Sequence, residues 1–253
     1  MSGMTSEELA LFNEATALAE RLWEKTKQVS GLNSDPKMFS CALFKRLHSN
    51  HRGFIALYNK DYLLEAEIIL RSGIEAAICI AANQRMGSAF VELMKQDAAA
   101  TVLGQIKAAR DNDAGNMVRD GEAMFRMLKA KIDPAKKPAK LDWKSLADEG
   151  HVPQLYGFHR NLSGVSSHVT GLSILRSFGG DGLSDRNEEL TALGRRMRPM
   201  MMVGATLQGS MIHGAMLDDA ALVADALVLT KRLSELSEDW PGVKKEPKPG
   251  QGR

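Results

Sequence analysis

The chain of 253 residues contains only two cysteines, Cys41 and Cys79, and they stand far apart in the sequence. Two isolated cysteines do not provide the paired spacing of a zinc site, so we expect free thiols in a reducing cytoplasm. The motifs of phosphate loops, dinucleotide sites and hydrolase nucleophile elbows are also missing. We therefore expect neither a metal nor a cofactor.

Charge of one sign and aromatic residues are also scarce, since the formal net charge is +2 and aromatics make up 6% of the chain. Nucleic-acid-binding proteins usually carry a strong positive field, and single-strand binders add aromatic rings that stack on bases. The basic clusters at 126–140 and 195–198 contain no interleaved aromatics. RNA is therefore a weakly supported partner, and we interpret both clusters as solvated surface.

The sequence lacks a long hydrophobic run. The N-terminal segment MSGMTSEELA has no basic region followed by apolar residues, so it does not resemble a secretory signal. The longest uncharged run, 199–217, is interrupted by four polar residues, which is too polar for a membrane span. We expect a cytoplasmic protein without a membrane partner.

The Met- and Gly-rich stretch 197–216 is then either central core or a homo-oligomer interface, and we expect a homodimer.

Helical signals dominate, and no period-two alternation typical of strands occurs. Thr5 and Glu8 form a capping-box pattern, and Asp35 precedes a proline in the manner of a helix start. Short connections between helices predict antiparallel hairpins. We predict an all-α, single-domain bundle of about seven to eight helices over residues 1–239. The Pro-, Gly- and Lys-rich segment 240–253 is predicted to be a disordered tail.

A column of charges crosses a predicted helix, 61–85, that is otherwise almost entirely apolar. Glu67, Arg71 and Glu75 follow one another at spacings of four, so they lie on one face. Charges in a buried helix need partners, because an unpaired buried charge is strongly unfavourable. The column is either a structural ion-pair network, which is the commoner case, or a polar pocket. In the pocket, Glu75 is an acid or base and Arg71 binds an anion.

The predicted helix 153–178 offers hydrogen-bonding side chains opposite its apolar stripe. His168 lies between these two faces, as a core histidine or as a general base. We predict that Arg71 and Glu75 face the helix that carries Ser163 and His168, and that a hairpin of 36–59 with 61–85 brings His48 to the column. The candidate catalytic residues are Arg160, His168 and Glu75. The candidate ligand-binding residues are Arg71, Glu75, Tyr156, Ser163, His168 and His48.

The segments LRSGIEAA (70–77) and YGFHRNLSGVSSH (156–168) resemble a bacterial all-helical family of unknown function. Its members share an Arg-Ser-x-x-Glu helix and a Tyr-to-Leu-Ser helix that ends in His. The resemblance covers roughly residues 63–176. The matching positions are Arg71, Glu75, Tyr156, Ser163 and His168. The family supplies no activity, and a role in stress or phage defence is expected by analogy alone.

A more distant likeness is to the HEPN superfamily of helical bundles, some of which are metal-independent ribonucleases with an Arg, a polar residue and a following His. Arg160 and Asn161 match the beginning of that motif, and His168 follows after a longer gap. We expect a non-enzymatic bundle that acts by protein association or through a small polar pocket. The alternative is a HEPN-like ribonuclease whose Arg160 and His168 converge on an open basic cleft across a dimer interface.

Overall fold

The computed structural model describes residues 3–31, 35–133, 135–165, 174 and 185–238, and this part of the chain is helical with no strand. The helices are α1 (Ser6–Thr26), α2 (Pro36–Tyr58), α3 (Leu63–Met86), α4 (Ser88–Asp111), α5 (Gly115–Lys129), α6 (Trp143–Glu149), α7 (Pro153–Val165), α9 (Asp185–Met216) and α10 (Ala220–Ser237). The predicted all-α class is confirmed, with slightly more helices in the described residues than expected. The predicted extension of α7 beyond residue 165 and the predicted tail 240–253 lie outside the described residues, apart from the single residue 174.

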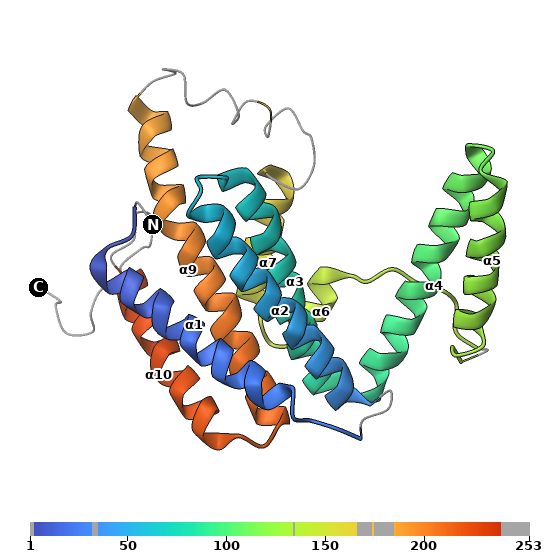
Figure 1. The fold of residues 1–253 in the computed structure, drawn as a ribbon, viewed down its shortest axis with the longest axis horizontal. Coiled ribbons are helices and arrows are strands. Elements are labelled where there is room, and N and C mark those ends of the chain that lie inside the picture. Colours follow the sequence, from blue (N-terminus) through green and yellow to red (C-terminus); the bar gives the residue numbers. More distant parts are fainter. Residues whose placement is uncertain (1–2, 32–34, 134, 166–173, 175–184, 239–253) are drawn as a thin grey trace, which may run out of the picture.

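The helices form a bundle and an arm (Figure 1). Helices α1, α2, α3, α9 and α10 make the bundle, and α6 and α7 pack on α3. Helices α4 and α5 pair as a hairpin that projects away from the bundle. Gly87 alone separates α3 from α4, with a φ of 58° that favours glycine. The base of α4 is anchored by the buried side chains of Phe90 and Val91.

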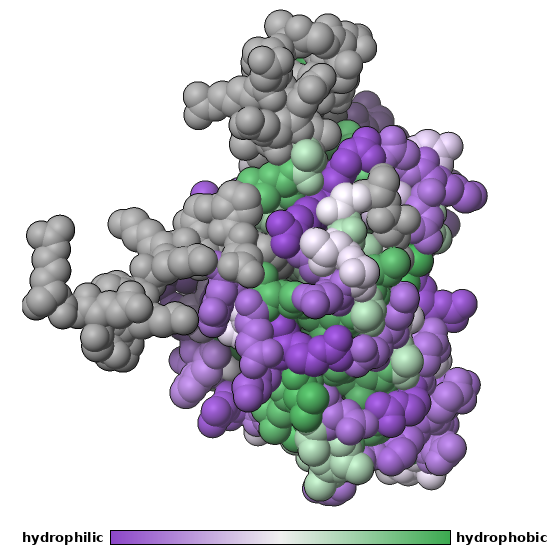
Figure 2. All heavy atoms as spheres, turned by 90° about the vertical axis from the view of Figure 1, so that its left-hand side faces the viewer, coloured by the Kyte–Doolittle hydropathy of each residue, from purple (hydrophilic) through white to green (hydrophobic). Residues whose placement is uncertain are grey.

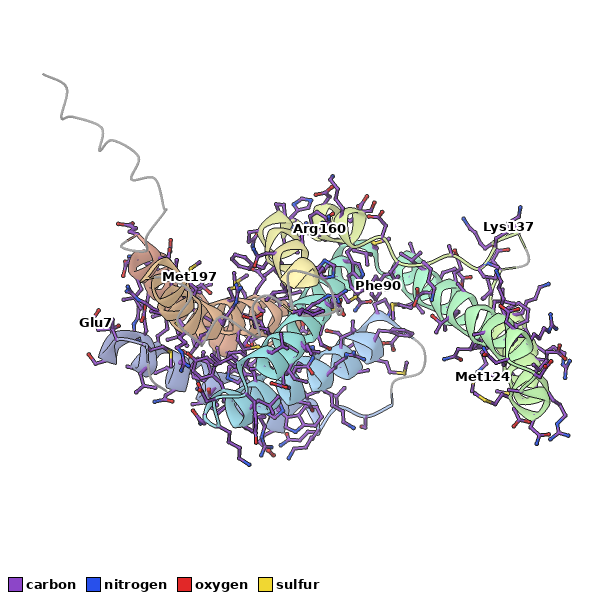
Figure 3. The ribbon with its side chains drawn as sticks, turned by 90° about the horizontal axis from the view of Figure 1, so that it is seen from above. Glu7, Phe90, Met124, Lys137, Arg160 and Met197 are labelled. Atoms are coloured by element: carbon purple, nitrogen blue, oxygen red, sulfur yellow. The ribbon has the colours of Figure 1, made fainter. Side chains whose placement is uncertain are left out.

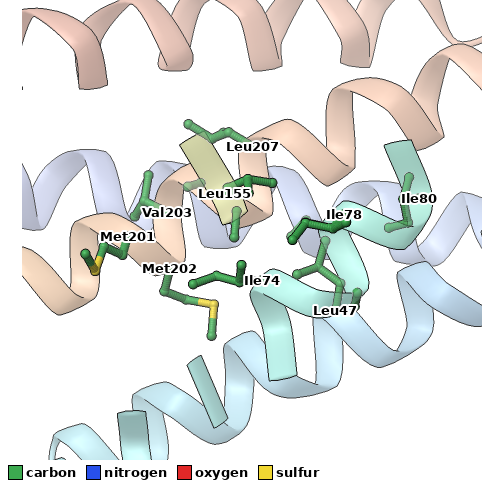
Figure 4. Packing of buried hydrophobic residues seen from close by; sticks show 14 of the residues in the cluster. Leu47, Ile74, Ile78, Ile80, Leu155, Met201, Met202, Val203 and Leu207 are labelled. Carbon is green, nitrogen blue, oxygen red and sulfur yellow. The ribbon is translucent and has the colours of Figure 1, made fainter. Parts of the chain in front are cut away.

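Helix α9 runs through the middle of the bundle and contacts α1, α2, α3 and α10. Its residues Met200, Met202 and Val203 are almost completely buried, and Figure 4 shows Met202 beside Ile74 of α3. Gly209 lies so close to Leu47 that a side chain there would collide with it. Of the two alternatives for this Met- and Gly-rich stretch, the central core is the one observed. Among the described helices, none combines the length and hydrophobicity that a membrane span requires.

The predicted helix starts at α1 and α2 are both observed. Thr5 accepts a hydrogen bond from the backbone N–H of Glu8 (3.2 Å), and the Glu8 carboxylate accepts one from the N–H of Thr5 (2.8 Å). The Asp35 side chain accepts from the N–H of Met38 at the start of α2 (2.7 Å). Glu8 is fully buried and pairs with Arg196 of α9 (2.7 Å), so the cap of α1 also fixes α1 against the central helix.

Pro199 lies inside α9 and leaves one backbone carbonyl of the helix without its usual donor. A proline has no N–H, so the carbonyl four residues earlier, that of Arg195, cannot form the helical hydrogen bond. The hydroxyl of Tyr58, at the end of α2, donates to this carbonyl. Burial raises the pKa of Tyr58 to about 12, so the phenol keeps the proton that it donates. Helix α2 thereby compensates for the proline in α9.

A second link between helices is made by His51 of α2, which is fully buried and stacks on Phe12. The Thr16 hydroxyl of α1 donates its proton to a carbonyl of its own helix (2.8 Å). Thr16 therefore accepts from the Nε2–H of His51 (2.9 Å), and the Thr206 hydroxyl of α9 donates to Nδ1 (2.8 Å). One neutral imidazole thus joins α1, α2 and α9 with all its polar atoms satisfied.

His213 of α9 makes the same kind of link nearer the other end of these helices. It is fully buried and stacks on Phe44. The Thr26 hydroxyl donates to the carbonyl of Leu22 (2.7 Å) and therefore accepts from His213 Nε2–H (2.9 Å). The Ser40 hydroxyl of α2 donates to Nδ1 (2.7 Å). Burial is the main factor that lowers the pKa of His51 and of His213 to about 4.

The compensation of Pro199 by Tyr58 predicts a non-additive pair of substitutions. Tyr58→Phe should lower the free energy of unfolding by about 1–2 kcal/mol, because it leaves a buried carbonyl without a donor. In a Pro199→Ala background the same change should cost less than half as much, since the N–H of Ala supplies the missing bond. Urea unfolding of the four proteins measures both costs. Equal costs in the two backgrounds would show that the phenol does not serve this carbonyl.

The lowered pKa values of His51 and His213 predict that the folded protein is less stable in acid. Their pKa of about 4 in the folded protein lies below the ordinary 6.5, so the unfolded chain binds more protons between these values. The free energy of unfolding should have its full value above pH 6.5. It should fall as the pH drops toward 4, by on the order of 3 kcal/mol per histidine. Urea unfolding between pH 7.5 and 4.5 tests this. His213→Gln, which cannot titrate, should reduce the slope; an unchanged slope contradicts the assignment.

Candidate functional site

The charged column of α3 divides between two neighbouring helices. Glu67 is 4% exposed and pairs with Arg198 of α9, with 3.0 Å between Glu67 Oε1 and Arg198 Nε. One turn later, Arg71 Nε lies 3.1 Å from Glu75 Oε1, and each of these two side chains is 21% exposed. The column is thus not a self-contained ion-pair chain. Its first member fixes α3 against α9, and the other two face α7.

His159 of α7 completes the cluster, which we call the α3–α7 cluster (Arg71, Glu75 and His159). Its Nε2 lies 3.1 Å from Glu75 Oε1, so the imidazole N–H donates to the carboxylate. The ring is 5% exposed and lies between the rings of Trp143 (centroids 5.3 Å apart) and Tyr156 (6.2 Å). The prediction that Glu75 faces this helix is therefore correct, with Arg71 bound to Glu75 beside it, but the partner on α7 is His159.

A carboxylate bonded to an imidazole is the arrangement that orients a general base in hydrolases. Catalysis also requires the second ring nitrogen to reach a substrate or nucleophile. Nδ1 of His159 is buried and has no hydrogen-bond partner among the described residues, and Arg71 Nε is buried without an aligned acceptor. The second ring nitrogen of His159 is therefore not accessible to a substrate, although Arg71 and Glu75 keep some exposure. The geometry of the cluster suits a packing contact that holds α7 on α3.

The prediction that His48 contacts the charged column is wrong. His48 is buried against α1, with Nε2 3.1 Å from Glu20 Oε2 and its ring stacked on Trp23 (centroids 5.7 Å apart). The hairpin does bring α2 beside α3, where Arg46 donates to Ser72 (3.1 Å). The helix was correctly placed, but His48 lies on its other side, because α1 covers that face of α2 and provides a carboxylate.

The remaining candidates do not assemble into a site in the described residues. Tyr156 stacks on His159, whereas the hydroxyl of Ser163 donates to the backbone carbonyl of His159 (2.7 Å) and so serves its own helix. Arg160 is exposed on the outside of α7. His168 lies outside the described residues, so its convergence with Arg160 stays a prediction. Sequence reasoning missed His159, although its four-residue spacing from Ser163 on a helix facing Glu75 was a usable signal.

A cavity of about 440 Å³ opens at the end of the bundle where α1 ends, α2 begins and α9 turns into α10. It contains none of the predicted site residues. Its lining lysines are already paired, Lys25 with Asp219 and Lys37 with Asp218 (3.7 Å). The charges lining it balance, so the cavity does not favour an anionic or a cationic ligand.

The arm carries the two most exposed large apolar side chains of the described residues, Met117 and Met127. Met117, Met124 and Met127, which we call the methionine face, are 68%, 52% and 63% exposed. Helix α5 has no buried residue, and it packs on α4 through Gly121, where a side chain would collide with Ile106. In Figure 3, Met124 lies on the opposite side of the arm from Lys137. The arm's own packing therefore leaves the methionine face uncovered.

Exposed apolar residues also occur on the bundle, but they do not form a comparable stripe. Leu227 and Val228 of α10 are 52% and 61% exposed. As sequence neighbours they point about 100° apart. Figure 2 shows hydrophilic side chains around the hydrophobic ones on the side of the bundle formed by α1 and α10. Isolated apolar residues of this kind are ordinary protein surface.

The α3–α7 cluster predicts a loss of stability when its charge is removed. Glu75→Gln keeps the shape and an acceptor for His159 but removes the carboxylate beside Arg71. We expect the free energy of unfolding to fall by about 1–3 kcal/mol. The matched change Glu235→Gln, in an exposed pair with Lys231, should cost less than about 0.5 kcal/mol. Urea unfolding measures both, and equal losses would mean that the cluster is not structural.

Comparison with known proteins does not extend this argument. No family model, no curated protein and no solved structure matches the chain. The resemblances drawn from the motifs at 70–77 and 156–168 therefore stay predictions. The function has to be inferred from the chain's own surfaces, of which the methionine face is the most unusual.

Proposed function

We propose that the protein acts by association with other protein chains, and that the α4–α5 arm is the element that makes the contact. The observation that carries this proposal is the methionine face, which stays more than half exposed on a helix with no buried residue. Large apolar side chains gathered on one exposed surface are typical of interaction sites. The proposal belongs to the non-enzymatic alternative from the sequence.

The chemistry of methionine supports this use. Its side chain is unbranched and flexible, with a polarisable sulfur, so it adapts to partner surfaces of different shape. Full burial of one such side chain is worth about 1.5–3 kcal/mol. A partner that covers Met117, Met124 and Met127 therefore gains several kcal/mol, enough to contribute substantially to a specific complex.

The shape of the arm also supports association. Because α4 and α5 pack on each other away from the bundle, the methionine face contributes nothing to the bundle's core. By contrast, the His159 ring of the α3–α7 cluster is buried with its second nitrogen, which argues against the small polar pocket. The ribonuclease alternative needs Arg160 and His168 in one cleft, and Arg160 is exposed on α7. A role in stress or phage defence is proposed from the family resemblance alone.

Photocrosslinking tests the proposed function. With the photoreactive residue benzoylphenylalanine in place of Met124, irradiation of living cells should give covalent protein adducts on a denaturing gel. Leu227 on α10 is the matched control, because it is apolar and also 52% exposed, and replacement there should give few adducts. The same adducts at both positions, or none at position 124, would contradict association through the arm.

A further inference from the structure

We propose that the partner of the methionine face is a second copy of this chain, with the two α5 helices packed antiparallel about a two-fold axis. This inference rests on the proposed function, because it assigns a partner to the same surface. A closed two-fold dimer uses one surface twice, so that surface must be complementary to itself. Between residues 120 and 131, the face of α5 meets this requirement in both its apolar and its charged residues.

Two charges share the face with the methionines. At about 100° per residue, Met117, Asp120, Met124, Met127 and Lys131 fall within an arc of about 80°. All five side chains are exposed. Lys131 lies two residues beyond the end of α5, and its N–H bonds to the carbonyl of Leu128 (3.0 Å), three residues earlier, so a tighter turn carries the chain through it. The face thus has an acidic residue near one end and a basic residue near the other.

An antiparallel arrangement places these residues against each other. A two-fold axis that passes between residues 125 and 126 brings Met124 of one copy opposite Met127 of the other. The same axis brings Asp120 opposite Lys131, because both lie equally far from it along the helix. Each contact forms twice in the dimer. A parallel arrangement would instead place Asp120 against Asp120 and Lys131 against Lys131, which is unfavourable.

The surroundings of the face permit close approach of a second helix. Ala123 and Ala130 lie beside Met127 on its far side and are exposed, so no long side chain stands between the two helices there. Within the described part of the chain, the ion-pair partner of Asp120 is Arg119, at 3.7 Å in a pair with about three quarters of each side chain exposed. Such a pair contributes little, so Asp120 can exchange it for Lys131 of the other copy. Two hairpins joined in this way form a four-helix bundle.

Charge reversal tests the arrangement, with the full chain studied by sedimentation equilibrium over a range of concentrations. The wild type should be a dimer. Asp120→Lys and Lys131→Asp should each weaken dimerisation by at least about tenfold, because each places like charges together twice. The double variant should return to within about threefold of the wild-type dissociation constant, since the reversed charges again face each other. Arg126→Asp changes an exposed charge on the opposite side of α5 and should have no comparable effect.

Circular dichroism of each variant confirms that it is folded, which is expected because α5 buries none of these side chains. A monomer at all concentrations, a dimer insensitive to the single reversals, or a double variant that is not restored would each overturn the dimer. If position 124 still crosslinks to a different protein, the proposed function stands and only the identity of the partner is wrong. If position 124 crosslinks to nothing, the proposed function fails as well.

Discussion

The bundle depends on one constraint, which is that three polar features of the central helix α9 need specific partners inside an apolar core, whereas the buried hydroxyl of Ser210 on the same helix has none among the described residues. Helix α9 brings a proline, a threonine and a histidine into contact with α1 and α2. Each is matched by a specific side chain: Tyr58 for the freed carbonyl, His51 for Thr206, and Thr26 with Ser40 for His213. Because these bonds have fixed partners, they determine the register of three helices, which apolar packing alone leaves loosely defined.

The buried polar groups therefore stabilise the packing of the helices. The exposed apolar surface lies elsewhere, on the arm. The α3–α7 cluster has the residue types of a catalytic dyad, but its His159 ring is buried between Trp143 and Tyr156. The arm contains none of the predicted site residues, yet it exposes apolar side chains that a folded protein normally covers. Residue chemistry alone would have pointed to the α3–α7 cluster as the functional site. The exposure of the side chains points instead to the methionine face.

Local sequence signals predicted the elements well. The capping box at Thr5, the helix start at Asp35 and the burial of 197–216 follow from rules that involve a few neighbouring residues. The partners of His48 and Glu75 depended on which helix covers which face, and a sequence without strong long-range signals does not fix that arrangement. The sequence also did not predict that α4 and α5 project away from the bundle, for the same reason. The amphipathic pattern of the arm predicts a helix but does not say whether the core or another molecule covers it.

The single-residue joint at Gly87 has a mechanical consequence. Two long helices meet there, α3 within the bundle and α4 within the arm, with no further residue to absorb movement. Helix α4 is 24 residues long, so its far end lies about 36 Å from the joint. A rotation of about 10° at Gly87 would sweep the tip of the arm through about 6 Å, roughly one helical pitch. A small rotation at this one link would thus displace the tip of α4 by about a helical pitch, while the buried Phe90 and Val91 hold its base on the bundle.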